Sequence, residues 1–190
     1  MTSRIHLTPA YDEQDHQFAR AFTLLAAAAE NRAFPGASLA IAHRGSLVAY
    51  KAVGRFTYDS TALLVVPETI YDLASLTKPI ATTTAAMLLF ERGLLDLEMP
   101  LELVVPEFQQ MVRDDRRRSQ ITLKMLLAHS SGLPAYARLF ENANTRDAMI
   151  RAACGLPLEA DPGTRTEYSD IGFILLGVAI ERIADEPLDR

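Results

Sequence analysis

Ser75 and Lys78 stand three residues apart, at the point where a long apolar segment begins. If that segment is helical, positions i and i+3 lie on one face, so the serine hydroxyl and the lysine amine can meet. A serine hydroxyl is a weak nucleophile, and a desolvated lysine amine can act as the base that activates it. Pro79 fits the first turn of such a helix, where no intrahelical N–H bond is lost. Ser75 is therefore the candidate nucleophile and Lys78 its candidate base.

An ordinary helix start, with a capping serine and an exposed lysine, is the alternative interpretation of this pair. The use of lysine favours the chemical interpretation, because only three of the 19 basic residues are lysines. Lysine can lose its proton within reach of neutral pH, whereas arginine stays charged.

The elements expected before this segment are a helix and a hairpin. Apolar residues at helical spacing predict a helix over residues 16–32. Two strand-like runs, 37–43 and 47–53, are joined through Arg44-Gly45, which is typical of a tight hairpin. Residues 54–70 are expected to form a loop.

Helices dominate the rest of the chain. The segment from 75 to 92 is expected to end at Gly93, a residue suited to a left-handed cap. Its packing face is expected to comprise Ala81, Ala85, Leu88 and Leu89. Later helices are predicted at 122–130, 145–153 and 171–184. The last is apolar on nearly every side and should be buried.

Two polar residues at helix ends have ordinary structural interpretations. His129, at the end of a helix, is expected to hydrogen-bond nearby backbone rather than to act in catalysis. Asp170 is expected to cap the helix that follows it.

Composition excludes several classes of function. A formal net charge of −5 gives no general attraction to nucleic acid or to an anionic membrane. The basic run Arg113–Arg118 contains two aspartates and no aromatic residue, so it is expected to be a solvated surface loop. The four histidines lack metal-ligand spacing, so neither a metal nor a cofactor is expected. Cys154 is the only cysteine, and the chain has no secretory or membrane-spanning pattern, so we expect a cytoplasmic protein.

A second constellation, Tyr168-Ser169-Asp170, lies between Pro162-Gly163 and an apolar helix. With it, the chain resembles the serine β-lactamase and penicillin-binding protein superfamily, in particular its class C-like branch of β-lactamases, esterases and D-amino-acid peptidases. Four blocks carry the resemblance in the family's order: Leu73–Pro79, Glu91–Leu97, Ile121–Pro134 and Pro162–Gly177. The motif S-x-x-K in the first block is a known catalytic signature.

The resemblance implies three catalytic roles. Ser75 would attack a carbonyl and become acylated, Lys78 would accept or relay its proton, and Tyr168 would pass the proton to the leaving group and help to activate water. A phenol, whose pKa is ordinarily about 10, can do this only if nearby cations lower that pKa, and Lys78 is the obvious cation.

Asp170 is where the chain departs from the family pattern, which usually has asparagine at this substrate-binding position. An ionised aspartate can only accept hydrogen bonds, whereas asparagine also donates. If the carboxylate lies close to Lys78, it should hold the lysine protonated. That would shift base catalysis toward Tyr168 and weaken the case for recognising a β-lactam amide.

The family's third motif, a Lys- or His-x-Gly on a later strand, has no counterpart in residues 171–190. That strand would supply one of the two oxyanion-hole donors. We therefore expect an N-terminal portion of a serine hydrolase. It would hydrolyse a small-molecule ester or amide, with an esterase favoured over a β-lactamase. The alternative is a non-catalytic remnant or a binding relative.

The expected fold is the α/β (α+β) fold of β-lactamase/transpeptidase-like proteins, without its C-terminal strands. Residues 1–56 would form the N-terminal helix and a two-stranded antiparallel hairpin. Residues 57–190 would form the mostly helical part that carries the site. No nucleic-acid or membrane partner is expected.

Overall fold

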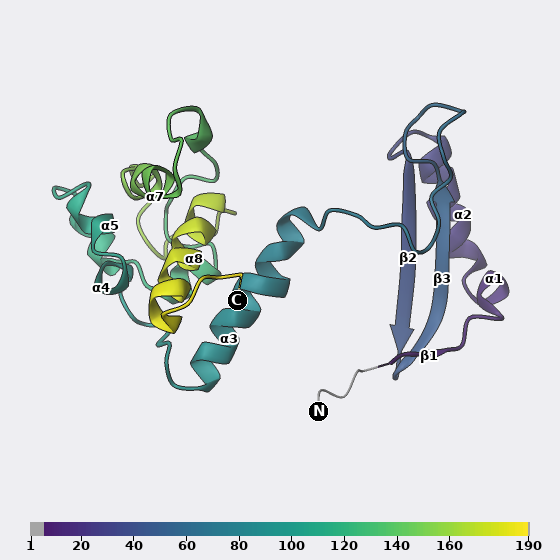
Figure 1. Cartoon of the computed structure of the whole chain (residues 1–190), viewed down its shortest axis with the longest axis horizontal. Helices are drawn as coiled ribbons and strands as arrows, with labels where there is room; N and C mark the ends of the chain where they lie inside the picture. Colours follow the sequence, from purple (N-terminus) through teal and green to yellow (C-terminus); the bar gives the residue numbers. More distant parts are fainter. Residues whose placement is uncertain (1–5, 190) are drawn as a thin grey trace. The chain divides into compact units, whose positions relative to one another are not determined.

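A computed structural model describes residues 6–189, and the chain divides into two compact units between Asp72 and Leu73 (Figure 1). The first unit contains a small sheet with two helices, and the second is mostly helical.

The sheet of the first unit has three strands in the order β1-β3-β2. The predicted hairpin is formed by β2 (Gly36–His43) and β3 (Ser46–Gly54), which pair antiparallel. Arg44 and Gly45 both have positive φ, 50° and 80°, as a tight two-residue hairpin turn requires. The expectation of only two strands is wrong, because β1 (Thr8–Pro9) pairs parallel with β3. A two-residue edge strand that contains proline leaves no alternating pattern in the sequence.

The helix predicted over 16–32 is interrupted at Phe18, giving α1 (Gln14–Gln17) and α2 (Ala19–Glu30). Helix α2 packs along β3, and Phe22 on α2 is buried there. The Lys51 ammonium of β3 lies 5.3 Å from the centre of the Phe22 ring.

The second unit begins with three different helical geometries in succession. A 3₁₀ turn (η1, Ala74–Leu76) leads into a π-helical turn (η2, Lys78–Thr83), and α3 (Thr84–Glu91) continues from it. Of the expected packing face, Leu89 is buried and Ala85 is partly buried, whereas Ala81 and Leu88 are exposed. A π turn holds more residues than an α turn, so it rotates the helix that follows and brings Ala86 inward instead.

The remaining helical segments are short except for the last two. They are α4 (Leu101–Val104), α5 (Glu107–Gln110), η3 (Arg116–Gln120), α6 (Leu123–Leu127), η4 (Leu139–Glu141), α7 (Arg146–Cys154) and α8 (Asp170–Ala184). The predicted helices at 122–130, 145–153 and 171–184 are thereby confirmed to within a few residues at each end.

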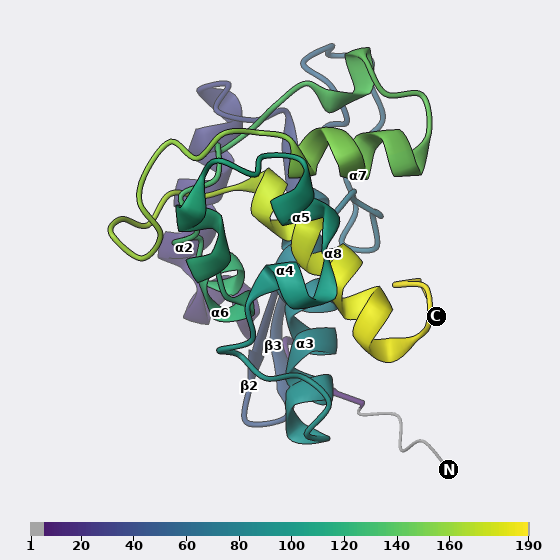
Figure 2. The same cartoon turned by 90° about the vertical axis from the view of Figure 1, so that its left-hand side faces the viewer.

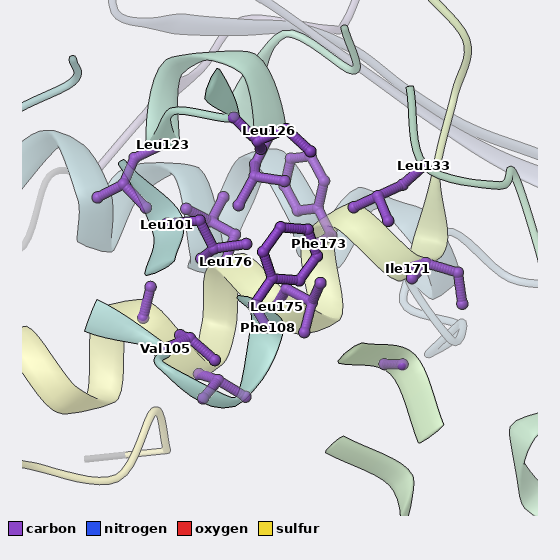
Figure 3. Packing of buried hydrophobic residues seen from close by; sticks show 14 of the residues in the cluster. Leu101, Val105, Phe108, Leu123, Leu126, Leu133, Ile171, Phe173, Leu175 and Leu176 are labelled. Carbon is purple, nitrogen blue, oxygen red and sulfur yellow. The ribbon is translucent and has the colours of Figure 1, made fainter. Parts of the chain in front are cut away.

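Helix α8 is the central element of this unit, with α4 and α7 beside it (Figure 2). Leu175, Leu176 and Ala179 on α8 are fully buried, and Leu101, Leu123 and Leu126 face them from α4 and α6 (Figure 3). Each fully buried leucine stabilises the folded unit by about 1.5–3 kcal/mol. This core fixes the position of the N-terminal end of α8, where Asp170 lies.

Arg118 corrects the expectation that the 113–118 run is wholly a surface loop. Its side chain is fully buried and lies over the Phe108 ring, with the guanidinium carbon 3.6 Å from the ring centre. The guanidinium donates hydrogen bonds to the carbonyls of Phe108, Leu156 and Cys154. One arginine thus satisfies carbonyls from two separate segments. The sequence gave no sign that Arg118 is buried, because a buried arginine is normally paired with a carboxylate and this one is not.

Candidate active site

Ser75 lies in the 3₁₀ turn η1, and Lys78 is the first residue of the π turn η2. The residue before the serine, Ala74, has φ of 44°, a left-handed conformation that costs a non-glycine residue about 1–2 kcal/mol. Strained backbone and π turns both cluster at functional sites. The local backbone therefore marks this segment independently of the side chains.

The structure brings Ser75, Lys78 and Tyr168 together. The Tyr168 hydroxyl donates a hydrogen bond to Ser75 Oγ at 2.7 Å, across 93 residues of sequence. The Lys78 ammonium donates to the same oxygen at the longer distance of 3.3 Å. Tyr168 as a whole is about half exposed.

Asp170 lies directly beside Lys78. The Lys78 ammonium donates to Asp170 Oδ1 at 2.6 Å, and the lysine side chain is only 17% exposed. Burial disfavours the ammonium and is the largest single influence on the pKa of Lys78. The hydrogen bonds with Asp170 and Tyr168 together outweigh it and raise that pKa above its usual value. Lys78 is therefore a cation at neutral pH.

Ser169 explains why Tyr168 and Asp170 both reach the site. It is extended, with φ of −133° and ψ of 115°, so its two neighbours project to one side and its own side chain to the other. The Ser169 hydroxyl is buried, donates to the Pro134 carbonyl and accepts from the N–H of Gly172. Ser169 is therefore the cap of α8, and the expectation that Asp170 caps this helix is wrong. Asp170 is left free to pair with Lys78.

Tyr168 is the titratable group best placed to remove a proton from Ser75. Hydrogen bonding with Lys78, and then with Ser75, lowers the pKa of Tyr168 below its usual value. At pH 7 an unperturbed phenol is ionised in about one molecule in 10³, and an unperturbed lysine is neutral in about four in 10⁴. The site increases the fraction of ionised Tyr168 and decreases the fraction of neutral Lys78, so Tyr168 is the more available base.

His129 was expected only to hydrogen-bond nearby backbone, and it does so, since its Nδ1 accepts from the Ser169 N–H at 3.0 Å. Its ring also lies 4.7 Å from the Tyr168 ring and 4.8 Å from the Phe173 ring, centre to centre. Burial, and then the charge of Lys78, lower the pKa of His129 below its usual value. Spacing along the sequence gave no sign of this contact, because His129 and Tyr168 are far apart in the chain.

A pocket of about 500 Å³ opens beside Ser75. Ser75, Lys78 and Asp170 are on its polar side, and the apolar wall includes Tyr136, Phe140, Phe173 and Ile174. The sequence did not identify these four residues as pocket-lining, because their positions look like ordinary core or surface positions. A larger hollow, of about 920 Å³, lies beside α7 and the end of α8. It is lined mainly by charged residues and includes none of the candidate catalytic residues.

Two further observations bear on the sequence-based expectations. Among residues 6–189, no three His, Cys, Asp or Glu side chains lie close enough together to hold a metal ion. Over the same residues, no helix combines the length and the apolar character that crossing a bilayer requires.

Residues 21–190 match the family model described as Beta-lactamase. The N-acetylmuramyl-L-alanine amidase of Bacillus subtilis is 34% identical over 170 residues, which cover 82% of this chain and 38% of that protein. This chain therefore spans about two fifths of the length of that relative.

Solved structures give the same result for the fold. A hydrolase with promiscuous acyltransferase activity superposes with a TM-score of 0.76 and 26% identity, covering 92% of this chain and 49% of the other. An octameric penicillin-binding protein homologue from Pyrococcus abyssi superposes with a TM-score of 0.68 and 30% identity, covering 92% of this chain and 40% of the other. These matches confirm the predicted β-lactamase/transpeptidase-like fold.

Proposed function

Because the chain belongs to the Beta-lactamase family, we propose that it carries the acylation site of a serine hydrolase, with Ser75 as nucleophile and Tyr168 as base. The observation that carries this proposal is the meeting of the Tyr168 hydroxyl and the Lys78 ammonium at Ser75 Oγ. An oxygen with a hydrogen-bonded base and an adjacent cation has what a serine needs to attack a carbonyl.

In the proposed reaction, Tyr168 in its phenolate form takes the Ser75 proton as Oγ bonds to the substrate carbonyl carbon. The tetrahedral oxyanion then expels the alcohol, which receives that proton from Tyr168 and leaves an acyl-enzyme. Water next attacks the acyl carbon, again losing its proton to Tyr168. The Ser75–acyl bond then breaks, Tyr168 returns that proton to Ser75 Oγ, and the acid product leaves a free serine and a phenolate. Lys78 stays cationic throughout and stabilises the phenolate.

The chemistry of the pocket favours a neutral ester as substrate. Among the described residues that line it, Lys78 is the only basic one, and Asp170 already pairs with it. β-Lactams and peptides ending in D-alanine carry a carboxylate. Because Lys78 is already paired with Asp170, the described part of the pocket offers such a carboxylate no unpaired cation. The aromatic wall instead suits an apolar acyl group.

The experiment is to incubate the chain with p-nitrophenyl butyrate, with nitrocefin and with a peptide amide, and to follow the intact mass. We expect a butyryl adduct on Ser75 from the ester and none from the other two substrates. The amide is included because one relative is named an amidase. Ser119→Ala, which removes an exposed serine of the same unit, is the matched control and should acylate normally. An adduct from nitrocefin but not from the ester would contradict the proposed substrate class.

Asp170→Asn is expected to move the pH dependence of Ser75 phosphonylation by a fluorophosphonate to lower pH. Asp170 raises the pKa of Lys78 and also raises that of Tyr168, so its removal lowers both. Both limbs of the pH–rate profile should therefore lie at lower pH than in the wild type. The rising limb follows the ionisation of Tyr168, and the falling limb at alkaline pH follows the loss of charge on Lys78. Asp147→Asn, at an exposed aspartate on α7, should leave the profile unchanged. If the alkaline decline of the rate did not shift in Asp170→Asn, the Lys78–Asp170 ion pair could not be what sets the pKa of Lys78.

A further inference from the structure

His129 holds the backbone on both sides of Tyr168. Its main-chain carbonyl accepts a hydrogen bond from the N–H of Glu167 at 2.8 Å. Its Nδ1 accepts from the N–H of Ser169 at 3.0 Å. The residues immediately before and after the tyrosine are thus both bound to one histidine, which comes from the segment that follows α6.

The same histidine also contacts the Tyr168 side chain. The two rings lie at 34° to each other with their centres 4.7 Å apart, and Phe173 flanks the imidazole at 4.8 Å. His129 has φ of 54°, so its own backbone is in the left-handed region. Histidine, asparagine and aspartate adopt this conformation more readily than other non-glycine residues, so asparagine can replace His129 at little cost to the backbone.

We propose that His129, in its neutral form, is the positioning residue of Tyr168, and that protonation of its imidazole releases the tyrosine from Ser75. The proposal rests on the proposed function, in which Tyr168 is the base. Its chemical reason is that Nδ1 must be an acceptor to bind the Ser169 N–H. An imidazolium carries N–H groups on both nitrogens, so Nδ1 would then face a second donor.

The surroundings of the imidazole keep it neutral at physiological pH. Lys78 faces it from η2 and Asp170 from α8, and Tyr168 is the titratable group in contact with it. Burial and the Lys78 charge lower the pKa of His129, and Asp170 opposes them only in part. The arrangement is therefore intact at neutral pH and is expected to be lost in acid, below the ordinary histidine range of about 6.5.

Two substitutions separate the two contacts. His129→Phe keeps a ring against Tyr168 but removes the acceptor of the Ser169 N–H. His129→Asn keeps an acceptor oxygen in the place of Nδ1 and tolerates the positive φ, but it removes the ring and does not titrate. His16→Asn, at an exposed histidine of α1, is the matched control. Thermal melting of each variant reports whether it folds.

The measurements are the Tyr168 ring resonances in ¹³C-tyrosine-labelled protein and the rate of Ser75 phosphonylation, both as a function of pH. In the wild type we expect the Tyr168 resonance to shift as His129 titrates, and the rate to fall more steeply below that pH than one proton explains. Both effects should vanish in His129→Phe and His129→Asn and persist in His16→Asn. At pH 8, His129→Phe should react roughly tenfold more slowly, because the segment that holds Tyr168 at Ser75 loses the net contribution of one hydrogen bond.

A Tyr168 resonance that shifts in the acid range in His129→Asn as it does in the wild type would overturn the proposal. So would folded His129→Phe protein that reacts at the wild-type rate with the wild-type pH profile. The resonance does not depend on catalysis. A wild-type protein that fails to phosphonylate, yet whose Tyr168 resonance follows His129, would disprove the proposed function and leave His129 as the positioning residue.

Discussion

Ser75→Ala is expected to abolish covalent labelling by a fluorophosphonate, with a loss of rate on the order of 10⁴–10⁶. In the proposed reaction of the wild type, Ser75 Oγ loses its proton to Tyr168, displaces fluoride and forms a bond to phosphorus. Among residues 6–189, no other serine accepts hydrogen bonds from both a tyrosine hydroxyl and a lysine ammonium. The measurement is the intact mass after incubation, followed by peptide mapping of the adduct.

The Ser75→Ala variant should fold normally, because Ser75 is exposed and its removal leaves no buried polar group unpaired. Its melting temperature should therefore match that of the wild type within a degree or so. Ser119→Ala provides the matched control and should label like the wild type. An adduct of unchanged yield in folded Ser75→Ala would show that the nucleophile lies elsewhere.

Tyr168→Phe is expected to lower the rate of Ser75 phosphonylation by about 10²–10⁴, the usual contribution of a general base. The change removes only the hydroxyl that lies 2.7 Å from Ser75 Oγ. The ring, and with it the contact to His129, remains. The loss should be greatest at high pH, where wild-type Tyr168 is ionised. The rate constant across the pH range is the quantity to measure.

Tyr58→Phe is the matched control, since Tyr58 is about half exposed and donates to a single backbone carbonyl, that of Arg32. It should not change the rate. If Tyr168→Phe retained the wild-type rate at every pH, Lys78 would have to be the base. That result would conflict with the raised pKa of its ammonium.

The sequence was most informative where local chemistry alone determines the structure. Arg44-Gly45 predicted the hairpin because few residue pairs accept two consecutive positive φ values. The all-round apolar pattern of 171–184 predicted a buried helix, and α8 is the centre of the helical unit. Ser75 and Lys78 were proposed from their spacing at the start of a helix, whereas Tyr168 was proposed from the family resemblance, which also indicated the fold.

What the sequence did not predict depends on contacts between distant segments. Ser169 and Asp170 are adjacent polar residues before a helix, and either can cap it. Ser169 does so because its side chain faces the buried Pro134 carbonyl. The burial of Arg118 likewise depends on carbonyls of residues 108, 154 and 156. Nothing in an arginine-rich run distinguishes the one member that points inward.

The distance in sequence between the nucleophile and its partner has a consequence for protein synthesis. Tyr168 follows Ser75 by 93 residues, so at about 5–20 residues per second the ribosome adds it roughly 5–20 s later. Throughout that interval the nascent chain carries a serine hydroxyl that has no tyrosine beside it. If Ser75 and Tyr168 act as proposed, acylation is therefore slow until α8 has emerged and docked, and an incomplete nascent chain reacts little with esters.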